Sequence, residues 1–419
     1  MELKKYRLGD IAEIIGGVSY SPKDICTGGI RILRGGNIQN QHIELKTDDV
    51  FLPISYKNNI SQIYVGDTIL VASTGSVDVL GKAATCFQYT EDVQIGAFLR
   101  IIRPKADKYT MLISSALSSD YFKRYIKAQA KGTSINNITL GYLRDFEIYA
   151  PHDFTGLSHL SANIENKICL NRAINDNLEA MAKQLYDYWF VQFDFPNEEG
   201  KPYKSSGGAM VYNERLKREV PIAWEVENLI DFAEIKNGAT PSTADEANYG
   251  GDIVWITPKD LSDQQSKFVY QGERNITKQG FDSCSTSMLP TNSVLMSSRA
   301  PIGLVSIAKH EVCTNQGFKS FIPKSISDSI YLYYYIKHHI KQIEQLGTGT
   351  TFKEVSRDDL CKFPILTIGA KDIYVQWIEL QNGIADKQLA LTKEIAALTK
   401  QRDELLPLLM NGQASVNSD

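Results

Sequence analysis

The residue types that most often bind metal ions or act as nucleophiles are present in this chain, but their spacing matches no such site. No C-x-x-C pair occurs, and no cysteine has a histidine at ligand spacing. His338 and His339 are adjacent, so on a helix they would point about 100° apart and could not hold one metal ion. The six cysteines are therefore expected to be reduced thiols, and no metal site is predicted: Cys26, Cys86, Cys169, Cys284, Cys313 and Cys361.

The motifs of phosphate-binding and hydrolytic enzymes are also missing. The segment 75–83 comes closest to a Walker A loop, but it is one residue too long, and Ala83 stands where Ser or Thr would bind magnesium. No G-x-G-x-x-G, G-x-S-x-G or H-E-x-x-H occurs. The Asn/Asp-Pro-Pro-aromatic tetrapeptide of amino-methyltransferases is absent too, and no D…E-x-K cluster is shared by the two halves. We therefore predict no catalytic residue and no cofactor in this chain.

Two heptad patterns predict the elements around which the chain is built. Apolar side chains recur three and four residues apart in 157–192 and again in 371–412, which predicts two long helices. Adding 217 to Ile174, Leu178 and Met181 gives Leu391, Ile395 and Leu398, and the polar seam residue Asn171 maps onto Gln388 in the same way. Two matched stripes favour an antiparallel coiled coil within the chain, each helix about 50 Å long at 1.5 Å per residue. The expected seam is Leu160, Ile164, Asn171, Ile174, Leu178, Met181 and Leu185 with Ile384, Gln388, Leu391, Ile395, Leu398 and Leu405.

The same offset, with small drifts, relates the segments that precede the helices. Leu8–Ile14 matches Leu229–Ile235, and Phe146-Glu-Ile148 matches Phe363-Pro-Ile365. Short β-branched runs between Gly, Asn, Asp and Pro predict twisted sheets with late helices at 111–131 and 327–346, an α+β class. We expect globular domains at 1–156 and 221–370, the two helices, a connector at 193–220 and a tail at 413–419.

Composition limits the function classes. A chain of 419 residues with 43% hydrophobic and 22% charged residues is large enough for two globular cores. The net charge of −4 does not predict tight DNA binding by this chain alone. The lysine-rich start lacks an apolar run, and no segment approaches the length of a membrane span. These features predict a cytoplasmic protein with no membrane partner.

Two similar units related by an approximate twofold axis suit a target with the same approximate symmetry, such as duplex DNA. The halves also differ, as at Ser73-Thr-Gly-Ser76 against Ser298-Arg-Ala-Pro301. Each unit is therefore expected to read a different short sequence, with the helices setting the distance.

With these elements in this order, the chain resembles the specificity subunit of a type I restriction-modification enzyme. The resemblance rests on Leu8–Ile14 followed by Gly17, its echo in 224–238, the Gly-Thr-Ser/Thr elements at Gly132 and Gly349, and Tyr188-Trp-Phe-Val-x-Phe193. It implies a non-catalytic subunit that reads a bipartite, asymmetric site in double-stranded DNA. It also implies two adenine-methyltransferase subunits and motor-nuclease restriction subunits as partners. S-adenosylmethionine, ATP and magnesium would belong to those partners.

Base edges are read by Arg, Lys, Asn, Ser and Thr side chains on loops, which gives two sets of candidates. The first unit contributes Arg34, Asn37, Ser73, Thr74, Ser76 and Lys82, and the second Thr257, Lys259, Ser297, Ser298 and Arg299. The alternative is that these are turn residues or ordinary solvated charges. Thr133, Ser134, Thr350 and Thr351 are candidates for phosphate contact, or else cap a preceding helix.

Two aromatic clusters have open assignments. Tyr188, Trp189 and Phe190 could contact a methyltransferase subunit or be buried against the connector, and Tyr333–Tyr335 are expected to be core or interface. Two other function classes stay open: a self-sufficient enzyme that reads and modifies DNA, and a coiled-coil adaptor with protein-binding domains.

Overall fold

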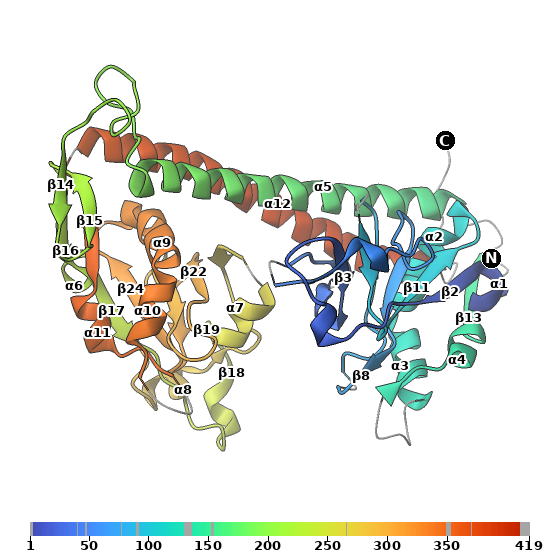
Figure 1. Cartoon of the computed structure of the whole chain (residues 1–419). Helices are drawn as coiled ribbons and strands as arrows, with labels where there is room; N and C mark the ends of the chain where they lie inside the picture. Colours follow the sequence, from blue (N-terminus) through green and yellow to red (C-terminus); the bar gives the residue numbers. More distant parts are fainter. Residues whose placement is uncertain are drawn as a thin grey trace. The chain divides into compact units, whose positions relative to one another are not determined.

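The computed structural model describes residues 3–39, 41–46, 48–76, 78–88, 92–129, 136–151, 155–264, 266–348, 353–369 and 371–410. The chain divides into two compact units, one formed by Met1–Ile174 with Leu391–Asp419 and the other by Asn175–Ala390. Each unit contains one globular part and a section of both long helices, which are shown in green and red in Figure 1.

The core of the first unit is an antiparallel sheet in the order β2-β11-β7-β9. Its strands are β2 (Ala12–Gly16), β11 (Leu99–Pro104), β7 (Thr68–Val71) and β9 (Ala83–Thr85). In β11, Ile101 pairs with both Ile15 and Ile69. Ile69 and Ile101 are fully buried, so the β-branched run of the central strand forms the centre of the core.

A second sheet of the first unit includes the strand β3 (Ile30–Leu33), which is followed by the candidate residues Arg34 and Asn37. In it, β3 lies between β10 (Val93–Ile95), which is parallel to it, and β6 (Val50–Leu52), which is antiparallel. Two-stranded pairs join β1 (Leu3–Arg7) to β13 (Glu147–Pro151), β4 (Ile38–Gln39) to β5 (His42–Ile43), and β8 (Ser73–Thr74) to β12 (Asn136–Asn137). Short helical turns are α1 (Leu8–Ile11), α4 (Leu140–Arg144), η1 (Pro22–Asp24), η2 (Gly35–Asn37), η3 (Ile54–Tyr56) and η4 (Asp107–Tyr109).

The late helix of each unit is broken into two, which differs from the single helices expected. In the first unit α2 (Thr110–Ser118) is followed by α3 (Asp120–Gln129). Ser119 is extended between them, and its hydroxyl donates to the carbonyl of Ala116 and accepts from the amide of Phe122. The serine thus gives one backbone group at each of the two helix ends a hydrogen-bond partner where the helix is interrupted. In the second unit, α9 (Ser329–His338) and α10 (Ile340–Leu346) meet at His339.

The second unit repeats the plan of the first. Its sheet has the order β17-β24-β21-β22-β20, and β19 (Trp255–Ile256) pairs in parallel with β23 (Cys313–Thr314). The sheet consists of β17 (Ala233–Asn237), β24 (Phe318–Pro323), β21 (Val294–Ser297), β22 (Val305–Ala308) and β20 (Phe268–Val269). Around it lie β16 (Glu225–Asn228) paired with β25 (Pro364–Thr367), β18 (Tyr249–Ile253), α6 (Leu229–Phe232), α7 (Pro258–Gln264), α8 (Lys278–Asp282), α11 (Arg357–Lys362), η6 (Glu246–Asn248) and η7 (Ile326–Asp328).

Two glycines show that the copies agree in detail. A Cβ atom at Gly17 would collide with the carbonyl oxygen of Gly96, and one at Gly238 would collide with that of Asn315. In both units the strand that starts the central sheet therefore passes closely over the loop that follows the parallel strand. The predicted α+β fold with two similar domains is confirmed.

The connector is held by aromatic packing. Helix α5 (Thr155–Tyr186) passes into a π-helical turn, η5 (Asp187–Val191), which ends the long helix. Phe193 and Phe195 are buried, and the ring of Phe195 stacks on both Trp224 and Tyr203. A hairpin of β14 (Met210–Asn213) and β15 (Arg218–Pro221) completes the segment.

The long helices α5 and α12 (Lys371–Met410) pack together and run antiparallel, as predicted. In the first unit Glu165 contacts Arg402, and the amide of Asn171 donates to Glu394 at 2.8 Å. In the second unit the contacts along α5 continue from Glu179 with Gln388 to the carbonyl of Ala182 with Gln381. As the residue numbers rise along α5, those of the contacting residues on α12 fall, so the two helices are antiparallel.

Two residues assigned to the seam lie outside it. Met181 is 57% exposed because Ala182 takes the buried position, one residue and about 100° farther round the helix. Leu405 is 37% exposed, and the buried side chain near it is Arg402. Of the other expected members, Asn171, Gln388 and Leu391 are buried and the rest are half-buried: Leu160, Ile164, Ile174, Leu178, Leu185, Ile384, Ile395 and Leu398.

Candidate functional site

Several loops of the first unit meet where β3, β7 and β10 end, and we call this meeting point the first junction. The amide of Gly96 donates to the carbonyl of Leu33 at 2.9 Å, which ties the loop after β10 to the end of β3. The carbonyl of Phe98 accepts from the amides of Ala72 and Ser73 at 3.0 and 3.1 Å. The first junction therefore consists of 17–18, 34–37, 72–76 and 96–98.

The first two candidate residues of this junction have different environments. Arg34 is exposed, and its guanidinium makes only a long hydrogen bond of 3.4 Å to the carbonyl of Asp48 among the contacts described. Asn37 is buried, which corrects the expectation that it reads bases. Its amide oxygen accepts from the Arg34 amide, and its NH₂ donates to the carbonyl of Glu44 and the carboxylate of Asp49. Because every polar atom of Asn37 has a partner, its side chain holds the turn that presents Arg34.

The second loop of the junction is more accessible. Ser73 and Thr74 form β8 and are half-buried, and their strand pairs with Asn137 and Asn136. Ser76 is exposed, and its amide donates to the Thr74 hydroxyl at 3.3 Å. Lys82 is exposed as well. The structure thus brings Ser73, Thr74 and Ser76 together with Arg34 at one junction.

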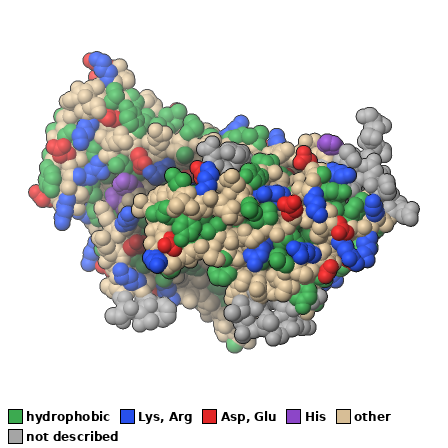
Figure 2. All heavy atoms as spheres, turned by 45° about the vertical axis from the view of Figure 1, so that its right-hand side comes forward, with side chains coloured by type: hydrophobic (Ala, Val, Ile, Leu, Met, Phe, Trp, Pro, Cys, Tyr) green, Lys and Arg blue, Asp and Glu red, His purple; other side chains and the backbone are tan. Residues whose placement is uncertain are grey.

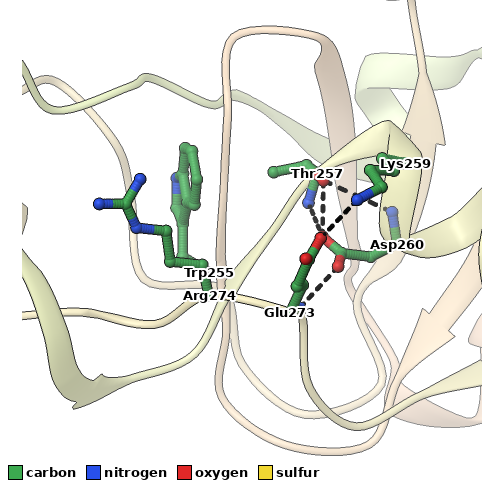
Figure 3. Close-up of a pocket in the computed structure, with 6 residues that line it drawn as sticks. All are labelled: Trp255, Thr257, Lys259, Asp260, Glu273 and Arg274. Atoms are coloured by element: carbon green, nitrogen blue, oxygen red, sulfur yellow. Dashed lines mark hydrogen bonds and ion pairs between the residues drawn. The ribbon is translucent and has the colours of Figure 1, made fainter. Parts of the chain in front are cut away.

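The corresponding segments of the second unit, 255–260, 273–274, 297–299 and 315–317, form what we call the second junction. It has a pocket, drawn in Figure 3. It has a volume of about 440 Å³ and is lined by Trp255, Thr257, Lys259, Asp260, Glu273 and Arg274. Asp260 is the counterpart of Asn37: it is buried, accepts from the amide and hydroxyl of Thr257 at 2.7 and 2.6 Å, and accepts from the amide of Glu273. Lys259 is exposed and pairs with Glu273 at 2.7 Å.

An exposed arginine in this pocket was not among the sequence candidates. The guanidinium carbon of Arg274 lies 3.6 Å from the ring centroid of Tyr249, which in turn contacts Trp255 edge-on. Figure 3 shows Arg274 beside Trp255 and apart from the Lys259–Glu273 pair. Its signal in the sequence is weak, because Arg274 lies outside the segments that match between the two halves.

The serines expected in the second junction are structural, which corrects their assignment as base contacts. Ser297 and Ser298 are fully buried. Their hydroxyls donate to the carbonyls of Pro301 and Gly317. Only Arg299 of this group is exposed, and it forms an ion pair with Glu354 at 2.9 Å. The candidates Thr133, Ser134, Thr350 and Thr351 lie outside the described residues.

A buried polar cluster joins the globular part of the second unit to its section of the helix pair. Lys267, 8% exposed, donates to the hydroxyl of Tyr334 at 2.7 Å and lies 3.4 Å from both Glu179 of α5 and Gln388 of α12. Burial lowers the pKa of the Lys267 ammonium, against the attraction of Glu179. A partly desolvated cation between these groups fixes the second globular part to the helices of the same unit.

The aromatic clusters are mostly internal. Trp189 and Phe190 are buried and their rings belong to the large core of the second unit, whereas Tyr188 is 37% exposed. Tyr333, Tyr334 and Tyr335 are all buried in the same core, as expected. Of the first cluster, Tyr188 alone keeps an exposed surface for a partner.

Three features bear on function in the part of the chain that the structure describes: potential metal sites, potential membrane spans and the surface charge. Among the described residues, no group of three or more His, Cys, Asp and Glu side chains is arranged to hold a metal ion. Within the same residues no helix is long and apolar enough to cross a membrane. Lys and Arg side chains are spread over the face drawn in Figure 2, with Asp and Glu among them.

Comparison with known proteins agrees with this doubled arrangement. Residues 1–180 and 221–407 match the family model described as "Type I restriction modification DNA specificity domain". The "Type I restriction enzyme MjaIX specificity subunit" of Methanocaldococcus jannaschii is 42% identical over 144 residues, which is 34% of this chain and only 33% of that subunit. The "Type I restriction enzyme HindI specificity subunit" of Haemophilus influenzae is 26% identical over 72% of this chain and 76% of its own length.

A solved structure shares the fold along the whole chain. The type I restriction-modification S subunit from M. genitalium superposes with a TM-score of 0.55 at 13% sequence identity. The superposition covers 99% of this chain and 97% of that one.

Proposed function

Since this chain belongs to the family of type I restriction-modification DNA specificity subunits, we propose that each of its globular parts reads one half of a bipartite, asymmetric site in double-stranded DNA. A specificity subunit recognises the DNA target and is itself non-catalytic. The domain limits that we propose are those of the sequence: recognition domains at 1–156 and 221–370.

The proposal of two different half-sites is supported by the differences between the junctions. The first presents Arg34 beside Ser73, Thr74 and Ser76. The second presents Lys259 and Arg274 around a pocket, and its serines are buried. Different donors on equivalent loops favour different base sequences, because base edges in the major groove differ in their donors and acceptors.

We propose that α5 and α12 set the spacing between the two half-sites. This proposal is supported by the register of the polar contacts between the two helices. Asn171 with Glu394 and Gln388 with Glu179 fix which turns face one another, because an alternative register would take these partners away from the buried amides of Asn171 and Gln388.

The partners and cofactors follow from the family and are part of the proposal. Two methyltransferase subunits would dock on the helices and connector, and restriction subunits would join for cleavage. S-adenosylmethionine, ATP and Mg²⁺ would bind to those subunits. The mixed charge of this chain suits such sharing, since partner subunits would supply part of the phosphate contact. We place the complex in the cytoplasm.

The observation that carries the proposal is the presence of two junctions built on one plan with different exposed side chains. Binding selection tests it: the chain is reconstituted with its methyltransferase subunit and incubated with a randomised duplex library. We expect enrichment of two short conserved blocks separated by unspecified bases. A single contiguous motif, or no enrichment, would contradict the proposal. Methylation by the purified chain with S-adenosylmethionine alone would instead favour a self-sufficient enzyme.

A further inference from the structure

A large aromatic side chain, Phe98, is exposed at the first junction. Its side chain is 67% exposed, in a loop whose next residue, Leu99, is fully buried. Exposing an aromatic ring forgoes roughly 2 kcal/mol of burial free energy. A single exposed apolar residue is ordinary on a protein surface, so the argument depends on how Phe98 is held and on what its counterpart is.

The backbone around Phe98 is tightly fixed. The Phe98 carbonyl accepts from Ala72 and Ser73, and the amide of Leu99 donates to the carbonyl of Gly96 at 2.9 Å. The guanidinium of Arg100 donates to the carbonyls of Ala97 and Leu99 at 2.8 and 2.7 Å. The Phe98 ring is thus directed outward by a turn with paired backbone groups, beside the loop that carries Ser73 and Thr74.

The second unit has the same turn without the ring. There Gly317 takes the place of Phe98, since its carbonyl accepts from the amide of Ser298 at 2.7 Å as that of Phe98 accepts from Ala72. A Cβ atom at Gly317 would lie 3.0 Å from Cγ of Pro258, so this unit fills the space with the first residue of α7. The shared scaffold therefore does not require an aromatic residue, and Phe98 is a feature of the first junction only.

An apolar side chain among hydrogen-bonding ones has a specific use on DNA. In the major groove thymine differs from the other bases by its 5-methyl group, which apolar side chains contact. Ser and Thr hydroxyls beside it can pair with neighbouring base edges. Building on the proposed function, we propose that Phe98 is a specificity-determining residue that contacts a thymine methyl in the half-site read by the first domain.

The test uses the reconstituted complex with the methyltransferase subunit and its selected DNA site. We expect Phe98→Ala to weaken binding to that site by roughly 5- to 20-fold and to leave binding to unrelated DNA unchanged. Replacing the contacted thymine by uracil, which lacks the methyl group, should weaken the wild-type complex and have no effect on the variant. The sensitive thymine should lie in only one half-site.

Ile54→Ala is the matched control. Ile54 is 73% exposed in the same unit, and it follows β6 at the end of β3 opposite to Leu33, because Leu52 pairs with Ile30. This variant should bind like wild type, and both variants should keep the wild-type melting temperature.

Three results would overturn the inference. These are wild-type affinity of Phe98→Ala, an equal loss on specific and unrelated DNA, and a loss in Phe98→Ala with no thymine whose methyl group matters. The last would indicate a wedge between base steps. Absence of any sequence preference in the wild-type complex would instead be a failure of the proposed function.

Discussion

At the scale of single residues, both junctions are organised by one buried polar side chain, which accepts the amide of the residue three positions before it. Asn37 does this for Arg34, and Asp260 does it for Thr257. In both, the side-chain oxygen accepts the amide that begins the turn. The turn is therefore kept although its first residue differs, an exposed arginine in one unit and a half-buried threonine in the other.

Asn37→Ala should destabilise the protein by about 1–3 kcal/mol, because the carbonyl of Glu44 and Oδ1 of the buried Asp49 carboxylate lose the Asn37 donor, while the other oxygen of Asp49 keeps Lys46 and Arg31. Denaturant unfolding of the full chain measures this. Gln39→Ala is the control: Gln39 donates one exposed hydrogen bond, to Gly36, and its loss should cost about 0.5 kcal/mol or less. Equal stability of the two variants would show that the Asn37 network does not hold the turn.

A second prediction at this scale concerns His339, whose ring stacks on Tyr335 with centroids 4.1 Å apart. Burial lowers the pKa of His339 from 6.5 to about 4. The unfolded chain therefore binds more protons between these values. The stability that depends on neutral His339 is full above about pH 6.5 and is lost as the pH falls toward 4, by at most about 3 kcal/mol.

Thermal unfolding between pH 7 and 4 tests this. His339→Gln should start from a lower melting temperature, because the stacking is lost, but should lose less on acidification than wild type. His310→Gln changes an exposed histidine of the same unit and is the control: its melting temperature should change with pH as that of the wild type does. A wild-type slope in the His339 variant would mean that other groups cause the acid sensitivity.

These residues also show where the sequence was informative. Arg34 and Lys259 are exposed cations, as the sequence predicts, although Lys259 lies in α7 and not in a loop. Asn37, Ser297 and Ser298 have the composition of a binding loop but are internal. Their type gives hydrogen-bonding capacity and not direction, which depends on partners distant in sequence such as Asp49 and Gly317. Arg274 was missed for the same reason, because it lies in a loop and its stacking partner Tyr249 lies 25 residues before it, in β18.

At the scale of elements, the helix pair carries charge in its buried seam. Arg402 and Glu165 are both buried and lie 2.9 Å apart. A buried pair of this kind adds little net stability, but removing one partner leaves an uncompensated charge.

Arg402→Ala should therefore cost about 3–5 kcal/mol, measured by denaturant unfolding. Lys400, two residues earlier on the same helix, pairs with Glu404 on the surface, and Lys400→Ala should cost about 0.5 kcal/mol or less. Arg402→Leu combined with Glu165→Leu should recover most of the loss. If the double variant is as unstable as the single one, lost packing and not the bare charge is responsible.

The heptad pattern predicted both long helices and their antiparallel direction. It was wrong about which side chains are buried at two seam positions, Met181 and Leu405. Apolar spacing selected Met181, whereas the small Ala182 is buried in its place. Alanine contributes little to a hydrophobic pattern in the sequence. At a seam it is buried because its small side chain lets two helix backbones approach, and this depends on the partner helix.

At the scale of the whole molecule, the chain contains two copies of one fold. The copies share backbone contacts and differ in their exposed side chains. Gly17 and Gly238 allow the same close approach, and Phe98 and Gly317 occupy the same turn with opposite properties. The duplication could be predicted from the sequence because the 217-residue offset continues through both the domains and the helices.

This separation predicts independent half-sites. Arg34→Ala combined with Lys82→Ala should relax only the block read by the first domain, and Lys259→Ala combined with Arg274→Ala only the other. Binding selection with each reconstituted variant measures this. Relaxation of both blocks by one pair of substitutions would mean that the domains do not read separately.

The most direct test of the central claim is the mapping of methylated adenines across the genome of the source organism, with and without the gene for this chain. Our account predicts one split motif, two short blocks separated by a fixed number of unspecified bases, that disappears on deletion and returns on complementation. A methylome unchanged by the deletion, or the loss of a contiguous motif, would contradict it.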